Sequence, residues 1–140
     1  MARKTIALLG PVPVINEEDM ASESITPGHL VEFTAGGLLQ RNDTINVVLA
    51  RAFALEREEL GKGIDDAYAS GDYVKIGSFH PGQRVYAFLA SGQCANKGDY
   101  LTPTTEGQLK VAASGTGRIA RALELTDATA GTSRVRAEIV

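Results

Sequence analysis

From residue 28 onward, the chain consists of short runs in which hydrophobic and polar residues alternate, separated by turns rich in Gly, Pro, Asn and Asp. The run 134–139 alternates charged and apolar residues with a period of two. Val85, Ala87 and Leu89 likewise share one face of a run. A period of two is typical of a strand with one buried face. Many short strands between turns predict a β-sandwich or β-barrel.

The first half of the chain is expected to contain a hairpin followed by a longer strand. Runs 30–33 and 38–40 flank an Ala-Gly-Gly turn and predict the hairpin, and an Asn-Asp turn then leads into a strand within 45–53. Residues 50–60 are also a helix candidate, because Ala, Leu, Glu and Arg are good helix formers. We favour a strand over 47–55.

The second half of the chain repeats the first at an offset of 70 residues. Between 28–61 and 98–131, nine of 34 positions are identical. The clearest match sets Leu-Ala-Arg-Ala-Phe at 49–53 against Ile-Ala-Arg-Ala-Leu at 119–123. A duplicated β module is the simplest explanation. Two similar hairpins that arise from common turn chemistry are the alternative.

Residues 1–27 are predicted to form an extended arm. Pro11 and Pro13 exclude a helix or a central strand, and an acidic patch follows them. The apolar residues of such an arm need a cover, and we favour a partner over this domain as the surface that provides it. They are Ile6, Leu8, Leu9, Val12, Val14 and Ile15.

Residues 56–70 are predicted to form a charged connection. Loops of this length within a compact domain are usually functional or disordered. We favour a loop that contacts a partner over a flexible loop in solvent. The candidate contact residues are Glu58, Glu59, Lys62, Asp65 and Tyr68.

The predicted fold class is therefore all-β: a small β-barrel or β-tulip-like domain with an extended N-terminal arm and a possible internal duplication. The arm covers 1–27 and a single β domain covers 28–140. Within this domain we expect repeat halves at 28–61 and 98–131 and a central hairpin at 71–90.

The amino-acid composition further limits the kind of core and the kinds of partner that the protein can have. The 140 residues include 6% aromatic residues and no Trp, so the core must rest on Val, Ile, Leu and Ala. The formal net charge of −3 provides no general attraction to nucleic acid or to an anionic membrane, and neither partner is expected. Cys94 is the one cysteine, which excludes an internal disulfide and suggests a reducing compartment.

No catalytic, cofactor or metal site is expected. His29 and His80 lie beside turns, and no third donor stands at a suitable spacing for a metal. Cys94 lacks the local sequence of a known nucleophile. The paired acids at 58–59 and 65–66 are more typical of a solvated loop than of acid/base chemistry. We therefore expect that the protein is not an enzyme.

Several of these segments together resemble a known family, the small capsid decoration or cement proteins of tailed bacteriophages. The resemblance lies in 71–74, 85–90 and 98–101, and above all in the ending. There, 119–124 passes through a small polar turn to 134–140, similar to the "A-x-A-L-E, turn, R-x-R-V-E-V" close of such proteins. Ala137 stands where the family has a second apolar Val or Ile.

This resemblance implies a β-rich domain that assembles on the outer surface of a mature phage head and stabilises the shell by bridging capsomers. The implied partners are the major capsid protein and further copies of the chain, as a homotrimer in preference to a homodimer. Synthesis in the bacterial cytoplasm and location in the virion follow from the same resemblance. The contacts would come from the arm and the 56–70 loop.

Two other classes stay open. A β-barrel module that binds a glycan or peptide would need exposed aromatic rings on a concave face, for which the four tyrosines are the candidates. A small-barrel hydrolase would need His29, His80 or Cys94 at its centre.

Overall fold

The computed structural model describes residues 5–8 and 15–140, and all the regular structure there is strand apart from two short 3₁₀ helices. The prediction of an all-β fold is confirmed. The strands are β1 (Ile15–Met20), β2 (Val31–Phe33), β3 (Leu39–Arg41), β4 (Ala52–Ala54), β5 (Tyr73–Ser78), β6 (Arg84–Leu89), β7 (Cys94–Ala95), β8 (Tyr100–Pro103), β9 (Leu109–Val111), β10 (Ala120–Ala122), β11 (Thr126–Asp127) and β12 (Ser133–Ile139). The helices are η1 (Glu58–Leu60) and η2 (Thr105–Gly107).

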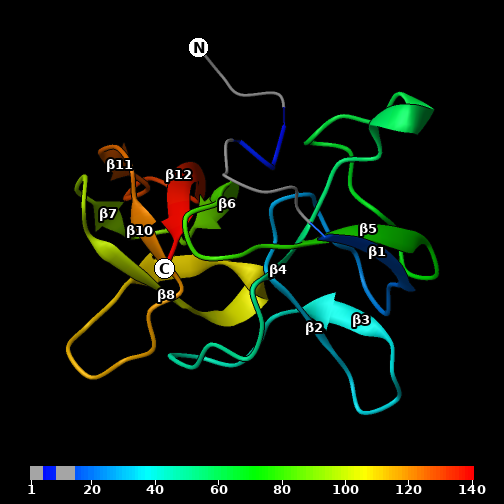
Figure 1. Ribbon diagram of the computed structural model, residues 1–140, viewed down its shortest axis with the longest axis horizontal. Coiled ribbons are helices and arrows are strands. Elements are labelled where there is room, and N and C mark those ends of the chain that lie inside the picture. The colour runs from blue at the N-terminus through cyan, green and yellow to red at the C-terminus, as the bar shows by residue number, and fades with distance from the viewer. Residues whose placement is uncertain (1–4, 9–14) are drawn as a thin grey trace.

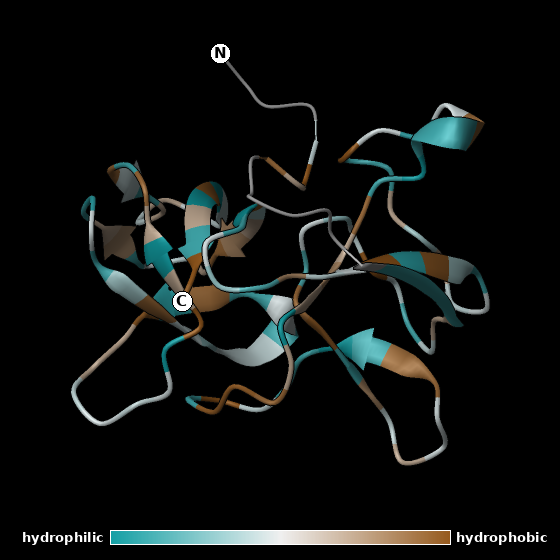
Figure 2. Ribbon diagram, in the orientation of Figure 1, coloured by the Kyte–Doolittle hydropathy of each residue, from teal (hydrophilic) through white to brown (hydrophobic). Residues whose placement is uncertain are grey.

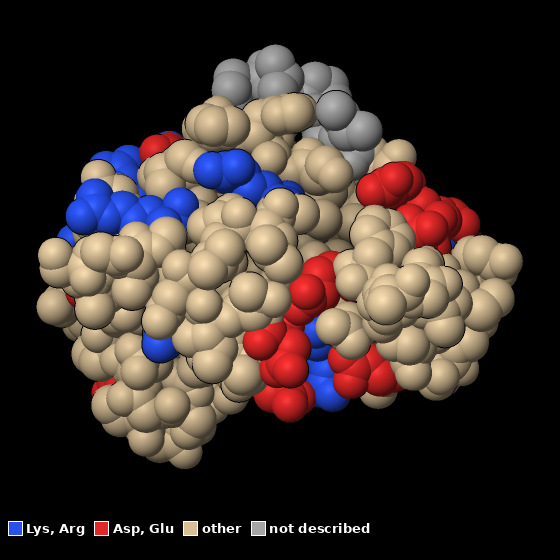
Figure 3. Space-filling model, turned by 90° about the horizontal axis from the view of Figure 1, so that it is seen from below, with Lys and Arg blue, Asp and Glu red and all other residues tan. Residues whose placement is uncertain are grey.

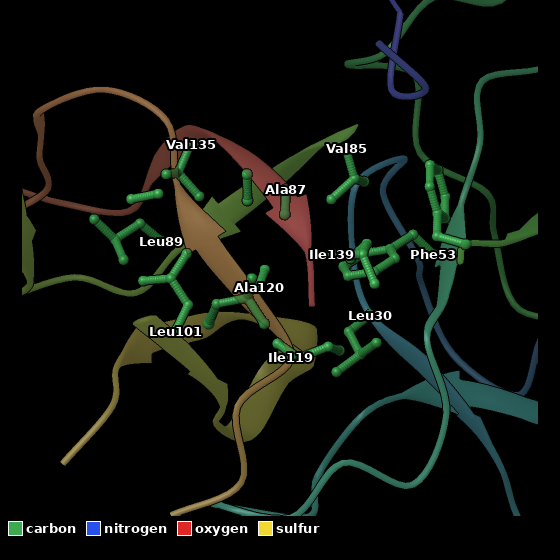
Figure 4. Packing of buried hydrophobic residues seen from close by; sticks show 14 of the residues in the cluster. Leu30, Phe53, Val85, Ala87, Leu89, Leu101, Ile119, Ala120, Val135 and Ile139 are labelled. Atoms are coloured by element: carbon green, nitrogen blue, oxygen red, sulfur yellow. The ribbon is translucent and has the colours of Figure 1, made fainter. Parts of the chain in front are cut away.

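The second half of the chain forms a closed barrel in the order β10-β12-β6-β9-β8. It occupies one side of the molecule, and β1 to β5 occupy the other (Figure 1). The hydropathy of β12 alternates along the strand, as its sequence predicts (Figure 2). Val135 and Ala137 therefore point inward, where they meet Val85, Ala87 and Leu89 of β6 (Figure 4).

The first half of the chain has the same strand order, closed less completely. β1, β5 and β4 form one sheet, and β2 pairs with β3. Two single bridges join these sheets: a parallel one from Ala21 to Leu39 and an antiparallel one from Leu30 to Phe53. The resulting circuit, β4-β5-β1-β3-β2, corresponds to β10-β12-β6-β9-β8. We call the two halves the first and the second barrel.

The two barrels share pairing registers as well as strand order. Val31 pairs with Arg41 in the first hairpin, and Leu101 pairs with Val111 in the second, each 70 positions later. The parallel bridge that ends on Leu39 also recurs in the second barrel, where β6 pairs with β9 in parallel. Matching registers at matching positions show that the sequence repeat is a structural duplication of a β module.

The offset changes to 68 residues at the next strand of each barrel. Ala54 accepts a hydrogen bond from the Gly28 N–H, and Ala122 accepts the equivalent bond from the Gly98 N–H, both at 2.8 Å. The alignment of 49–53 with 119–123 is therefore wrong by two positions. An Ala-x-Ala pattern with a period of two looks the same after a two-residue shift, and both alignments place the alanines on the same face.

The predicted long strand within 45–55 is also wrong, because only β4 is a strand there. The preceding segment runs from β3 to β4 along the second barrel and forms hydrogen bonds with the end of β8 and with the loop before β10. The Asn46 N–H donates to the Pro103 carbonyl at 2.9 Å, and the Gly117 N–H donates to the Asn46 carbonyl at 2.8 Å. Asn46 has a φ of 65°, which no strand residue adopts.

The predicted central hairpin over 71–90 does not form. β5 pairs with β1 and β4, whereas β6 pairs with β12 and β9. The turn at 79–83 thus joins two barrels and not two paired strands. Each strand finds its partners within its own module, because the module boundary falls in this turn.

The boundary placed at residue 27 is likewise wrong. β1 pairs with β5 along its whole length, and Ile25 forms a bridge with Tyr68. The acidic part of the predicted arm is therefore a strand of the first barrel. Pro11 and Pro13 lie outside the described residues.

Two hydrophobic cores follow from the duplication. The smaller one lies in the first barrel and the larger one fills the second. The larger core also takes in Leu30 and Phe53, which lie near Ile119 and Ile139 where the two barrels meet (Figure 4). The smaller core consists of Ala21, Ile25, Val31, Leu39, Ala54, Tyr68, Val74 and Ile76.

Candidate binding surfaces of the first barrel

Arg57 organises the loop that follows β4. Its guanidinium donates to Glu18 at 3.1 Å, to Glu59 at 3.2 Å and to the carbonyl of Tyr73 at 2.7 Å. Only 15% of the Arg57 side chain is exposed. Lys75 adds a second cation at 3.5 Å from Glu59. These contacts hold η1 against β1 and β5.

A groove of about 410 Å³ lies between this loop and the two strands. Tyr68 forms part of its wall, but the Tyr68 hydroxyl donates to the Leu55 carbonyl at 2.8 Å and burial raises the pKa of the phenol. Tyr68 is therefore mainly structural, whereas 57% of Tyr73 is exposed. The groove is lined by Glu18, Arg57, Leu60, Lys62, Asp66, Ala67, Tyr68, Asp72 and Tyr73.

The structure brings part of the predicted loop set together. Lys62 and Tyr68 line the groove, and Glu59 lies beside it on η1. Glu58 is exposed on the same helix. Asp65 is exposed and lies 3.3 Å from Arg134 of β12, so it turns toward the second barrel.

Among the groove residues that sequence reasoning did not single out are Arg57, Leu60 and Tyr73. Leu60 falls within the predicted charged connection, yet it is 67% exposed, and an apolar residue inside a charged run is the signal that could have identified it. Arg57 has no sequence signal of its own, because its three partners come from β1, η1 and β5.

The apolar residues of the predicted arm separate into three groups. Ile6 is fully buried in the larger core, and Leu8 is half-buried. Ile15 begins β1. Leu9, Val12 and Val14 lie outside the described residues.

A buried carboxyl group holds the segment of Ile6. The Ile6 N–H donates to a Glu56 carboxylate oxygen at 2.9 Å. Burial raises the pKa of Glu56, and the hydrogen bond from Ile6 opposes that rise. Because its side chain packs in the core of this chain, Ile6 is excluded from the contact surface proposed below.

An acidic cluster surrounds Arg41 of β3, with members from the first barrel and from η2 of the second. Its guanidinium lies 2.9 Å from Glu23 and 2.8 Å from Glu106. Arg41 lowers the pKa of Glu23 through this contact. Figure 3 shows acidic side chains gathered around a basic one on this face, apart from other Lys and Arg side chains at the left of the view.

The residues considered for catalysis, His29, His80 and Cys94, belong to three different segments of the fold. His29 is buried, and its Nδ1 accepts the Thr26 N–H at 3.0 Å. Burial, aided by nearby Arg41, lowers the pKa of His29 to about 4. His80 and Cys94 are exposed.

Metal-ligating side chains do not gather in residues 5–8 and 15–140. Within these ranges, no group of three or more His, Cys, Asp and Glu side chains is arranged to hold a metal ion. No helix in the same part of the chain is long and apolar enough to cross a membrane.

Comparison with known proteins shows a fold similar to that of the base of one phage head fibre. No family model and no curated protein matches the sequence. Among solved structures, the chain is similar to the N base of the head fibre gp8.5 of bacteriophage phi29, with a TM-score of 0.63. The alignment covers 91% of this chain and 95% of that chain at 12% identity. At this identity, the likeness establishes the shared fold.

Proposed function

We propose that this protein is a structural component of a phage particle that binds the outer surface of the head and stabilises the shell by bridging capsomers. The observation that carries the proposal is the match to a head-fibre base over nearly the full length of both chains. Independent support comes from the ending of the sequence, which resembles that of capsid decoration proteins. In this role the protein acts without catalysis.

The partners under this proposal are the major capsid protein and further copies of the chain, as a homotrimer. An oligomer that touches several shell subunits gains avidity and opposes their separation. Exposed Leu60, with Lys62 and Glu58 beside it, is the centre of the shell contact that we propose. An apolar centre within a polar rim is the usual anatomy of a protein interface.

The test uses heads of the encoding phage assembled without this protein. Light scattering first measures the mass of the purified chain, and co-sedimentation with these heads then measures attachment. We expect a trimer that binds at a saturating ratio fixed by the symmetry of the shell. A monomer that stays in the supernatant would overturn the proposal.

A matched pair of variants locates the contact. Leu60 and Leu125 are 67% and 65% exposed, and they lie in corresponding connections, from β4 to β5 and from β10 to β12. We expect Leu60→Asp to weaken head binding about tenfold or more. Leu125→Asp should bind as the parent does. Equal effects would remove the loop from the mechanism.

A module that binds a glycan or peptide is the second candidate, and the groove is the observation that favours it. Tyr73 offers an exposed ring at its wall. Retention on a glycan array that is lost in Tyr73→Ala, together with failure to bind heads, would select this second candidate.

A further inference from the structure

The outer edge of β1 carries main-chain groups with no partner among the described residues. In an antiparallel sheet, the N–H and C=O groups of alternate residues point to opposite sides. The Ser22 N–H donates away from β5, to the Leu39 carbonyl at 2.8 Å. The groups of Asn16, Glu18 and Met20 therefore point the same way, and no described residue pairs with them there.

The corresponding edge of the second barrel is occupied. There the Tyr86 N–H of β6 donates to the Ile6 carbonyl at 2.7 Å, and the Leu8 N–H donates to the Arg84 carbonyl at 3.0 Å. Ala7 forms an antiparallel bridge with β6 between these two bonds. Residues 5–8 thus add a short strand to the barrel.

The internal duplication relates the two edges residue by residue. β1 corresponds to β6, because each runs antiparallel to the equivalent strand of its barrel and each ends at the parallel bridge. At the offset of 68, Glu18 takes the place of Tyr86, and Asn16 takes the place of Arg84. The Glu18 N–H and the Asn16 C=O are therefore the counterparts of the two groups that hold the added strand.

The side chains on the two edges differ in charge. β6 presents Val85 at the centre of its occupied edge, and an apolar segment with Ile6 covers it. β1 presents Glu17, Glu18 and Asp19 in the corresponding stretch. Three adjacent acids favour an added strand that carries Lys or Arg, and they disfavour the same edge of a second copy.

We propose that the outer edge of β1 binds an extended basic segment of a partner protein as an added antiparallel strand. The Glu18 N–H and the Asn16 C=O hold its main chain, and Glu17 and Asp19, which share one face of β1, pair with its Lys or Arg side chains, whereas the Glu18 carboxylate stays paired with Arg57. Recognition of this kind takes affinity from main-chain hydrogen bonds and specificity from alternate side chains. The inference goes beyond head binding and holds whichever protein supplies the segment.

The test measures amide hydrogen exchange by NMR in the full chain. The probe is the capped peptide Thr-Lys-Val-Lys-Thr-Lys-Val, and the control peptide replaces each Lys with Glu. In the free protein, the Glu18 amide should exchange fast and the Asp19 amide, which faces β5, should exchange slowly. Saturation with the basic peptide should slow exchange at Glu18 by about tenfold or more and leave Asp19 unchanged.

Two variants separate the main-chain contribution from that of charge. Glu18→Pro removes the outward N–H, which the β5 pairing does not use, together with the carboxylate that pairs with Arg57, and Glu18→Gln removes that charge alone. Proline is tolerated at such edge positions. The Met20 N–H points to the same edge, so the peptide should protect the Met20 amide from exchange in the parent protein. Glu18→Pro should abolish this protection. Glu18→Gln keeps the N–H and should weaken binding only a few-fold. If Glu18→Pro lowers the melting temperature, the double reversal Glu17→Lys, Asp19→Lys serves in its place and should prefer the acidic peptide.

Three results would overturn the proposal. They are equal protection by the acidic peptide, no protection at Glu18 at any peptide concentration, and a dimer in light scattering that Glu18→Pro dissociates. The last result would assign the edge to a second copy. The two peptide outcomes do not bear on sedimentation with heads, so the strand proposal and head binding fail separately; a dimer would also contradict the expected trimer.

Discussion

The two barrels share a hydrogen-bonding layout and differ in how much of each is covered. In the second barrel, β8 and β10 pair over two residues and β6 and β9 over one, and residues 5–8 of the same chain cover the rest of the β6 edge. The first barrel closes through single bridges, and it keeps an acidic edge and a long loop with exposed Leu60. The second barrel is the more completely covered module, and the first barrel leaves the surface on which we propose the partner contacts.

The largest expected difference in stability between the two barrels comes from placing a charge in each core. Val135 and Val74 occupy equivalent positions and both are fully buried. Val135→Asp should cost about 4 kcal/mol, because the second barrel offers the carboxylate no route to solvent. Val74→Asp should cost about 2 kcal/mol, since the open edge of β1 lies beside it. Urea unfolding measures both, and equal losses would contradict the difference in closure.

A pair of equivalent glycines in the two hairpins tests how closely the backbone is packed in each barrel. Gly107 and Gly37 are 70 positions apart and both have positive φ, at 68° and 83°. A Cβ on Gly107 would lie 2.8 Å from the Leu30 carbonyl, whereas nothing lies within 4 Å of one on Gly37. We expect Gly107→Ala to cost about 3 kcal/mol and Gly37→Ala about 1 kcal/mol. Thermal melts that rank the two in the opposite order would contradict the close packing of η2 against the first barrel.

Acid should affect the first barrel before the second. His29 and Asp99 occupy equivalent turns, and each accepts an N–H three residues earlier, at 3.0 and 2.9 Å. The folded pKa of His29 is lowered from 6.5 to about 4. The contribution of neutral His29 to the free energy of unfolding is therefore complete above pH 6.5. It is lost as the pH falls toward 4, and the total loss is about 3 kcal/mol.

The control for this titration is His29→Asn, which keeps an acceptor without a titrating group. Its stability should be flat between pH 6.5 and 4.5, where the parent declines. Urea midpoints across this range measure the difference. Parallel curves for both proteins would show that His29 is protonated in the folded state.

The smallest expected effect concerns Glu23, which accepts the Arg41 N–H at 2.9 Å. Its counterpart in the second barrel is the neutral Gln93, which accepts the Val111 N–H at 3.2 Å. Glu23→Gln should cost about 0.5 kcal/mol, because the ion pair with Arg41 is partly exposed. The loss should vanish at 1 M salt. A loss that persists there would mean that the acceptor geometry, and not the charge, is what matters.

Much of the fold could be predicted from alternation alone. β12 and β6 alternate strictly, so their inward faces, centred on Val135 and Val85, follow from the sequence. The duplication could also be detected from the identical residues at equivalent positions. The shift from 70 to 68 could not be found, because Ala-x-Ala matches itself after two positions.

The candidate site could be predicted only in part. The loop of Glu58 and Lys62 is recognisable from its charge and length, both local properties. The grouping of Arg57, Tyr73 and Glu18 depends on three segments that meet only in the folded chain. The hairpin over 71–90 failed for a related reason, since local turn signals do not reveal whether two strands belong to one module or to two.

The contact of Arg134 with the long loop has a mechanical consequence. Its guanidinium donates to the Ile64 carbonyl at 2.7 Å and to the Pro27 carbonyl at 3.0 Å, from the longest strand of the closed barrel. Tension applied at the loop therefore reaches β12, which is paired with a strand on each side. A pull on the more open module is borne by the more closed one.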